Sequence, residues 1–107
     1  MNVLNDLYSI AIDRKQNYDE KSYTCYLFEQ GLDKILKKVG EETSEVIIAA
    51  KNGDNAALTG EICDLAYHLI VLLAETGTDI REVEAELCKR REKLGNLKEL
   101  KQTDKDT

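Results

Sequence analysis

Residues that interrupt regular structure are scarce in this sequence. It contains no proline and only six glycines among 107 residues. Because proline and glycine interrupt helices more than other residues do, their scarcity permits long helices and disfavours a turn-rich β-sandwich. Hydrophobic residues make up 42% of the chain, which is enough to fill one core in a domain of this length. The composition therefore favours a globular helical domain.

Paired cysteines and a basic surplus are also missing, and no N-terminal leader is expected. Cys25, Cys63 and Cys88 form no C-x-x-C motif, which indicates buried or half-buried thiols in a reducing compartment. The net charge of -6 argues against nucleic acid or an anionic membrane as a partner. The first residues do not form a signal peptide, and the longest apolar stretch, residues 65–74, is too short to cross a bilayer. We expect a cytoplasmic protein.

Apolar residues recur at helical spacing in four segments: residues 3–14, residues 32–51, residues 56–75, and a segment that begins at Asp79 and has apolar positions as far as Leu94. Gly53 is expected to cap the second segment in the left-handed conformation, and Gly77 to end the third. Asp79 and Glu82 form the pattern of a capping box at the start of the fourth.

The loops between the last three segments are short, so these helices are expected to be antiparallel neighbours. The sequence thus predicts an all-α fold, an antiparallel bundle of four main helices. We expect a single domain over residues 1–95 and a polar C-terminal tail, residues 96–107, that frays.

The third segment is too apolar to be covered by one small chain. Between residues 62 and 74, every side chain is apolar except those of Asp64, Tyr67 and His68. A helix that is apolar on all sides must be covered on all sides, which three short helices do not achieve. We expect homo-oligomerisation to complete the bundle, as a dimer or a higher even-numbered oligomer.

Two groups of acidic residues lie on neighbouring predicted helices: Glu41, Glu42 and Glu45 on one, Glu61 and Asp64 on the other. Residues three or four positions apart share a helix face, so the acids within each group are neighbours. Carboxylates on an apolar helix persist when they are paired, protonated or bound to a metal ion. Mg²⁺ prefers oxygen ligands and leaves positions for phosphate oxygens and water, so this pattern suits phosphoryl transfer.

Ion pairing could account for the same acids in two ways. Lys34 and Lys38 share a face with Glu41 and Glu45, which is typical of a solvated helix surface with salt bridges. The acids of the third segment are equally compatible with buried pairing to Lys or Arg from another helix. Spacing alone therefore does not separate a metal site from a set of ion pairs.

The motifs around these acids resemble those of a known family. Residues 40–45, GEETSE, followed by residues 61–64, EICD, are similar to the E-E-x-x-E…E-x-x-D signature of MazG-like all-α nucleotide pyrophosphatases. With Ser-Tyr-Thr at residues 22–24 and Asp-Leu-Ala-Tyr-His at residues 64–68, the chain resembles the phosphoribosyl-ATP pyrophosphatases of histidine biosynthesis. The resemblance extends from about residue 4 to residue 91.

This resemblance implies a hydrolase that uses Mg²⁺ and water to convert phosphoribosyl-ATP to phosphoribosyl-AMP and pyrophosphate. It implies Glu42, Glu45, Glu61 and Asp64 as metal ligands. Glu42 and Glu45 would also be catalytic, together with Glu41, which would be a further ligand or the base that takes a proton from water.

The remaining candidate residues have weaker assignments. Lys34 and Lys38 would bind the triphosphate or the departing pyrophosphate. His68 is expected to be a hydrogen-bonded core residue or a partner of Asp64. The last candidates either contact the substrate or form a helix-capping turn: Ser22, Tyr23 and Thr24.

Two alternative functions belong beside this one. A pyrophosphatase that removes dUTP, dCTP or damaged nucleotides would have the same fold. A non-catalytic helical module, which associates through its apolar faces and uses its acids for solubility, would have the same composition.

Overall fold

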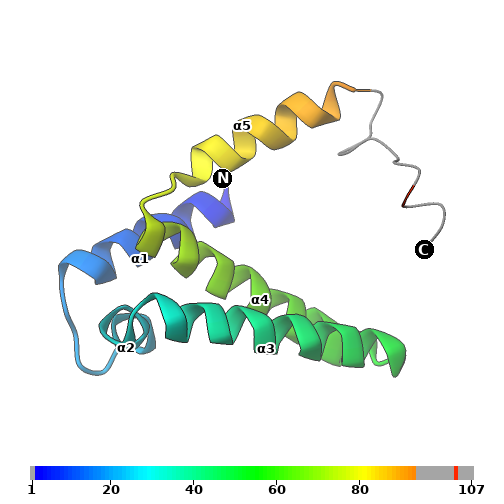
Figure 1. Cartoon of the computed structure of the whole chain (residues 1–107), viewed down its shortest axis with the longest axis horizontal. Helices are drawn as coiled ribbons and strands as arrows, with labels where there is room; N and C mark the ends of the chain where they lie inside the picture. The colour runs from blue at the N-terminus through cyan, green and yellow to red at the C-terminus, as the bar shows by residue number, and fades with distance from the viewer. Residues whose placement is uncertain (1, 94–102, 104–107) are drawn as a thin grey trace.

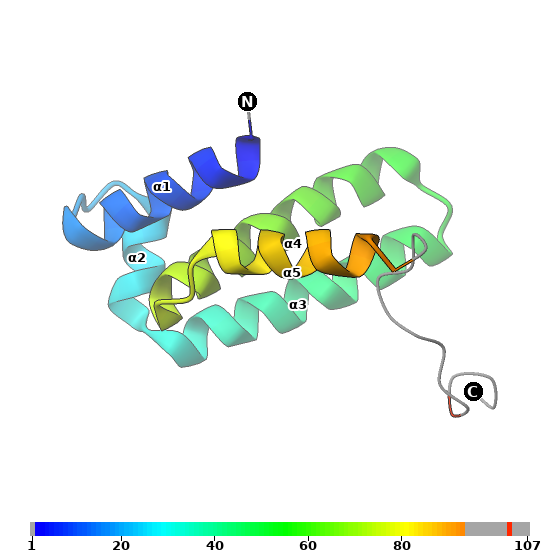
Figure 2. The same cartoon turned by 90° about the horizontal axis from the view of Figure 1, so that it is seen from above.

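The computed structural model describes residues 2–93 and 103, and it is all-helical over these residues, as predicted. Its five helices are α1 (Val3–Gln16), α2 (Tyr23–Gln30), α3 (Leu32–Lys51), α4 (Asn55–Thr76) and α5 (Ile80–Arg91), shown in Figures 1 and 2. The four predicted helices correspond to α1, α3, α4 and α5, while the short helix α2 was not predicted. The predicted apolar position Leu94 and the tail at residues 96–107 lie outside the described residues, apart from residue 103.

Local signals set the helix ends. Gly53 has a φ angle of 71°, in the left-handed conformation predicted for it, and Gly77, with a φ angle of 76°, ends α4 as predicted. Asp79 is the N-cap of α5, although its carboxylate accepts a hydrogen bond from the backbone N–H of Arg81 rather than from that of Glu82. Lys15 of α1 donates to the backbone carbonyls of residues 74 and 75 at the end of α4. A cation is favourable there because the C-terminal end of a helix carries partial negative charge.

The core consists of two small clusters, and α4 contributes to both. One contains Ala11, Ile70, Ala74 and Ile80. The other contains Leu27, Ile35 and Val71, all of them fully buried. The second cluster joins α2, α3 and α4, so the short helix α2 fills the space at one end of the α3–α4 pair (Figure 1).

Helices α3 and α4 lie side by side as an antiparallel hairpin in both views (Figures 1 and 2). The expectation that α5 would be a third antiparallel neighbour is wrong. It runs away from α4 and meets α1, where Asn2 donates a hydrogen bond of 2.9 Å to Glu84 (Figure 1). The physical reason is composition, because α5 has few apolar residues and buries only Ile80.

The outer face of α4 is uncovered in the single chain. Ile62 and Leu69 are 50% and 41% exposed, whereas Ile70, Val71 and Ala74 are buried. Cys63, next to Ile62, is exposed too, as is Cys88 on α5, so the expectation of buried or half-buried thiols holds only for Cys25. Cys63 and Cys88 are exposed because no other part of the described chain packs against their helix faces.

Helix α4 is also long and apolar enough to cross a membrane, with 22 residues and a mean hydropathy of 1.5 over an 18-residue window. The expectation that no apolar stretch reaches this length is therefore wrong, because the helix extends beyond residues 65–74 at both ends. The core helix of a soluble protein meets the same criterion. Asp64, near the middle of α4, would cost about 2.5–3.5 kcal/mol at the centre of a bilayer, which argues for a protein cover instead.

Candidate active site

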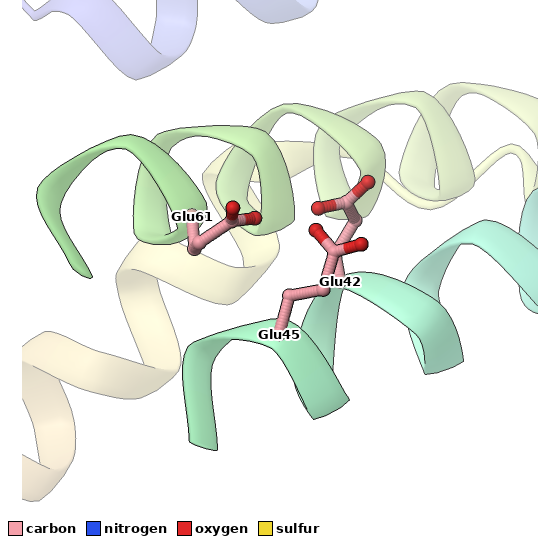
Figure 3. A group of neighbouring side chains, drawn as sticks. All are labelled: Glu42, Glu45 and Glu61. Carbon is pink, nitrogen blue, oxygen red and sulfur yellow. The ribbon is translucent and has the colours of Figure 1, made fainter. Parts of the chain in front are cut away.

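Three carboxyl groups meet between α3 and α4. Glu42 and Glu45 come from α3 and Glu61 from α4, and one oxygen atom of each lies within 4.8 Å of those of the other two. Figure 3 shows the two α3 side chains rising toward α4 and Glu61 turned toward them. The three-residue spacing places Glu42 and Glu45 on one helix face, and the hairpin brings that face against α4. This is the convergence of acids that the sequence predicts for the two helices.

No cationic side chain among the described residues forms a salt bridge with these three groups. None of the salt bridges that the structure records there involves Glu42, Glu45 or Glu61. One oxygen each of Glu42 and Glu61 is buried and has no hydrogen-bond partner within the same part of the chain. The alternative of buried pairing with Lys or Arg therefore finds no support in the described chain.

Two of the crowded acids, Glu61 and Glu42, hold a proton more tightly than ordinary carboxyl groups do. A hydrogen bond with Glu45, followed by burial and the charge of Glu45, raises the pKa of Glu61 from 4.5 to about 7. Burial, then the charge of Glu45, raises the pKa of Glu42. A hydrogen bond between two carboxyl groups requires a proton on one of them, so at neutral pH the cluster shares protons.

The donor set fits a hard divalent cation. All of its atoms are carboxylate oxygens, which Mg²⁺ prefers, and two of the three side chains have a buried oxygen without a partner in the described chain. A bound cation would supply the positive charge that otherwise comes from shared protons.

The other predicted acids lie outside this group of three. Asp64 is exposed, and its charge contributes to the raised pKa of both Glu42 and Glu61. Glu41 forms a salt bridge of 3.4 Å with Lys38, as the alternative of a solvated helix surface with salt bridges predicts. The hydrogen bond with Glu41 raises the pKa of Lys38, which therefore keeps its positive charge. Lys34 lies one turn earlier on α3 and is half-buried.

The Ser-Tyr-Thr motif anchors α2 to α4. Ser22 caps α2 by accepting a hydrogen bond from the backbone N–H of Cys25, which confirms the capping alternative for this residue. Two consecutive residues of α2 then meet two consecutive residues of α4. The Tyr23 hydroxyl is 2.9 Å from Nε2 of His68, and the Thr24 hydroxyl is hydrogen-bonded to that of Tyr67. These pairs are visible only once the helices are packed together.

His68 is buried, with 6% of its surface exposed. Its Nδ1 atom is 2.7 Å from the backbone carbonyl of Asp64, one turn earlier on α4. It is therefore a hydrogen-bonded core residue, which was one of the two predicted roles. Its hydrogen bond to Asp64 is made to the backbone rather than to the carboxylate. The hydrogen bond to the backbone of Asp64 places His68 one turn from the acids of α4.

A cavity of about 230 Å³ opens beside the carboxyl groups at the turn between α3 and α4. Two of the three acids line it, Glu45 and Glu61, together with Ile48, Ala49, Asn52, Asp54 and Ala57. It has room for part of a ligand next to the acids. The spacing of residues in the sequence does not predict this cavity, because residues of both α3 and α4 line it.

Comparison with known proteins points to one family. Residues 4–91 match the family model described as phosphoribosyl-ATP pyrophosphohydrolase. A protein of Pelotomaculum thermopropionicum named phosphoribosyl-ATP pyrophosphatase is 59% identical over 91 residues, or 85% of this chain and 93% of its own length. Proteins of the same name from Listeria welshimeri and Clostridium novyi are 56% and 53% identical, over 95% and 92% of this chain and 98% and 89% of their own lengths.

The raised pKa of Glu61 makes a prediction about stability in the absence of divalent cations. The folded protein keeps a proton on Glu61 between pH 4.5 and about 7 that the unfolded chain releases, so folding is increasingly disfavoured as the pH rises through this window. Glu61→Gln removes that penalty. Thermal unfolding in a chelator should therefore show the variant above the wild type in melting temperature at pH 8, with the difference shrinking toward pH 5.

The matched control is Glu20→Gln, at an exposed position in the loop before α2. Its effect on the melting temperature should not change with pH over this range. A Glu61→Gln gain that is the same at pH 5 and pH 8 would contradict the shared-proton interpretation.

Proposed function

Because the chain belongs to the phosphoribosyl-ATP pyrophosphohydrolase family, we propose that it hydrolyses phosphoribosyl-ATP to phosphoribosyl-AMP and pyrophosphate in histidine biosynthesis. The observation that carries this proposal is the cluster of Glu42, Glu45 and Glu61 inside the matched residues. Such a cluster has no structural benefit of its own, since it places three acids together without a balancing side chain in the described chain.

We propose Mg²⁺ as the ion that this cluster binds. Glu42, Glu45 and Glu61 would hold it, with Asp64, one turn beyond Glu61 on α4, as the fourth acid predicted from the sequence. The ion would neutralise the carboxylates and the triphosphate and polarise the phosphate oxygens. Its binding would also displace the protons that the acids share.

The chain itself would supply charge and proton transfer. Lys34 and Lys38 lie on α3 before the acids and would attract the phosphates, and the salt bridge with Glu41 keeps Lys38 protonated. An attacking water forms a bond to the α-phosphorus while the bond to the bridging oxygen breaks, and pyrophosphate leaves. The proton of the water would pass to a carboxylate, for which Glu41 stays the proposed base.

The turnover test compares carboxamide variants with the wild type. Glu42→Gln and Glu61→Gln should each lower kcat on phosphoribosyl-ATP by about 10²-fold or more, because each removes a proposed ligand of the Mg²⁺ ion whose charge would stabilise the transition state. Circular dichroism should show an unchanged helix content. Glu20→Gln is the matched control and should keep full activity.

Two results would overturn parts of this proposal. If the wild type turned over dUTP or dCTP as well as phosphoribosyl-ATP or better, phosphoribosyl-ATP would no longer be the proposed substrate. Full activity of Glu42→Gln would end the assignment of the cluster as the metal site.

We also propose that the active form is a cytoplasmic homodimer or a higher even-numbered oligomer, built from one domain over residues 1–95. Only 17% of the apolar window of α4 is buried in the single chain. Ile47 and Ile48 on α3 and Ile62 on α4 are each at least half exposed. Burying one large aliphatic side chain contributes roughly 1.5–3 kcal/mol, so a second copy that covers these residues is favoured.

The oligomer is tested by placing a charge on α4. Leu69→Lys should dissociate the protein into smaller species in analytical ultracentrifugation at micromolar concentration, because a lysine is costly inside an apolar interface. Leu4→Lys on α1 is a matched control, since Leu4 is 43% exposed and Leu69 is 41% exposed. A wild type that sediments as a stable monomer would refute the proposal, and equal effects of both variants would refute the choice of face.

A further inference from the structure

The hydrogen bonds of His68 fix which of its ring nitrogens carries the proton. The backbone carbonyl of Asp64 can only accept a hydrogen bond, and it lies 2.7 Å from Nδ1. In the neutral ring the proton therefore sits on Nδ1, and Nε2 presents a lone pair. The hydroxyl of Tyr23, 2.9 Å from Nε2, must then be the donor in that bond. Because the ring is buried, no other arrangement of the neutral side chain satisfies both contacts.

The hydrogen bond to His68 limits which hydrogen bonds Tyr23 can form with a ligand. A tyrosine hydroxyl has one proton, and that proton is directed at His68. The oxygen therefore presents only lone pairs on its free side. It accepts a hydrogen bond, and it has no proton to give to a phosphate oxygen, which at neutral pH is itself an acceptor.

Tyr23 lies close to the acids of α4, because His68 connects its hydroxyl to the backbone of Asp64. Tyr23 is 47% exposed. Its ring stacks on that of Tyr26 and packs edge-to-face with that of His68. Burial raises the pKa of its hydroxyl group, the charge of Lys38 lowers it, and the charges of Glu42 and Glu41 raise it. Lys38 has its own partner in Glu41, at 3.4 Å. The Tyr23 oxygen is thus a hydrogen-bond acceptor close to Lys38 and to the acids of the proposed site.

We propose that Tyr23 is a specificity-determining residue whose oxygen accepts a hydrogen bond from a sugar hydroxyl of the nucleotide, with His68 as its positioning residue. The inference rests on the proposed function. The ribose attached to the α-phosphate is the group next to the bond that breaks, and its hydroxyls are donors. Phosphate oxygens offer none, so the charge-bearing part of the substrate goes to the lysines and the acids instead.

The test compares Tyr23→Phe with the wild type on phosphoribosyl-ATP and on its 2′-deoxy and 3′-deoxy analogues in the ATP ribose. Loss of one hydrogen bond should lower kcat/KM on the full substrate by about tenfold, mainly through KM. On the analogue that lacks the accepted hydroxyl, the same substitution should have an effect of less than about twofold, since the bond is already gone.

Tyr26→Phe is the matched control, because it removes a hydroxyl for which no hydrogen bond is recorded among the described residues. It should leave kcat/KM within about twofold on every substrate, as expected for the loss of an unpaired surface group. An equal loss for Tyr23→Phe on all three substrates would overturn the inference, because the donor would then not be a 2′- or 3′-hydroxyl of the ribose next to the α-phosphate. A loss confined to kcat would point to a water molecule as the donor and would overturn it as well.

The premise has a test that does not depend on turnover. His68 is the only histidine of the chain, so ¹⁵N NMR of a protein made without a histidine tag reports on this ring alone. The wild type should show the Nδ1–H tautomer, with Nε2 unprotonated, and Tyr23→Phe should shift the Nε2 resonance. An Nε2–H tautomer would overturn the inference.

Failure of the proposed function would be seen separately, as a wild type that does not hydrolyse phosphoribosyl-ATP. In that case ATP, 2′-deoxy-ATP and 3′-deoxy-ATP are compared as ligands by calorimetry in the presence of Mg²⁺. If Tyr23→Phe changed the affinity for ATP, 2′-deoxy-ATP and 3′-deoxy-ATP by the same factor, the role of Tyr23 would still be refuted.

Discussion

Mutual repulsion among Glu42, Glu45 and Glu61 is the constraint around which this molecule is built. One oxygen of each lies within 4.8 Å of those of the other two, and no cationic side chain in the described chain forms a salt bridge with them. Shared protons reduce the repulsion at neutral pH, as the pKa of about 7 for Glu61 indicates. The apolar contacts of the α3–α4 hairpin must hold the acids together against the remaining repulsion, and a bound cation would relieve it.

The rest of the fold supports this hairpin. Leu27, Ile35 and Val71 pack α2 against both helices at the end of the hairpin nearest the Ser-Tyr-Thr motif. Two hydrogen bonds, from Tyr23 to His68 and between Thr24 and Tyr67, attach α2 to α4 beside the acids. The same contacts that complete a small core therefore also place Tyr23 and Lys38 next to the cluster. Stability and the geometry of the site depend on one set of packed residues.

Much of this arrangement could be predicted from residue spacing. The bounds of α3 and the glycines at positions 53 and 77 follow from apolar periodicity and turn chemistry, and the convergence of Glu42, Glu45 and Glu61 follows from a short loop between two helices. Helix α2 was missed because eight residues are too few to show a period. The position of α5 and the partners of His68 depend on contacts between distant segments, which no local pattern contains.

Proton release on cation binding tests whether the carboxyl cluster is a metal site. Isothermal titration of Mg²⁺ into the protein at pH 7, in two buffers of different ionisation enthalpy, gives the number of protons released per ion bound. With a pKa of about 7 for Glu61, the wild type should release roughly half a proton per site from this residue, and Glu61→Gln should release less and bind more weakly. Binding without proton release, or with the same affinity in Glu61→Gln, would contradict the assignment.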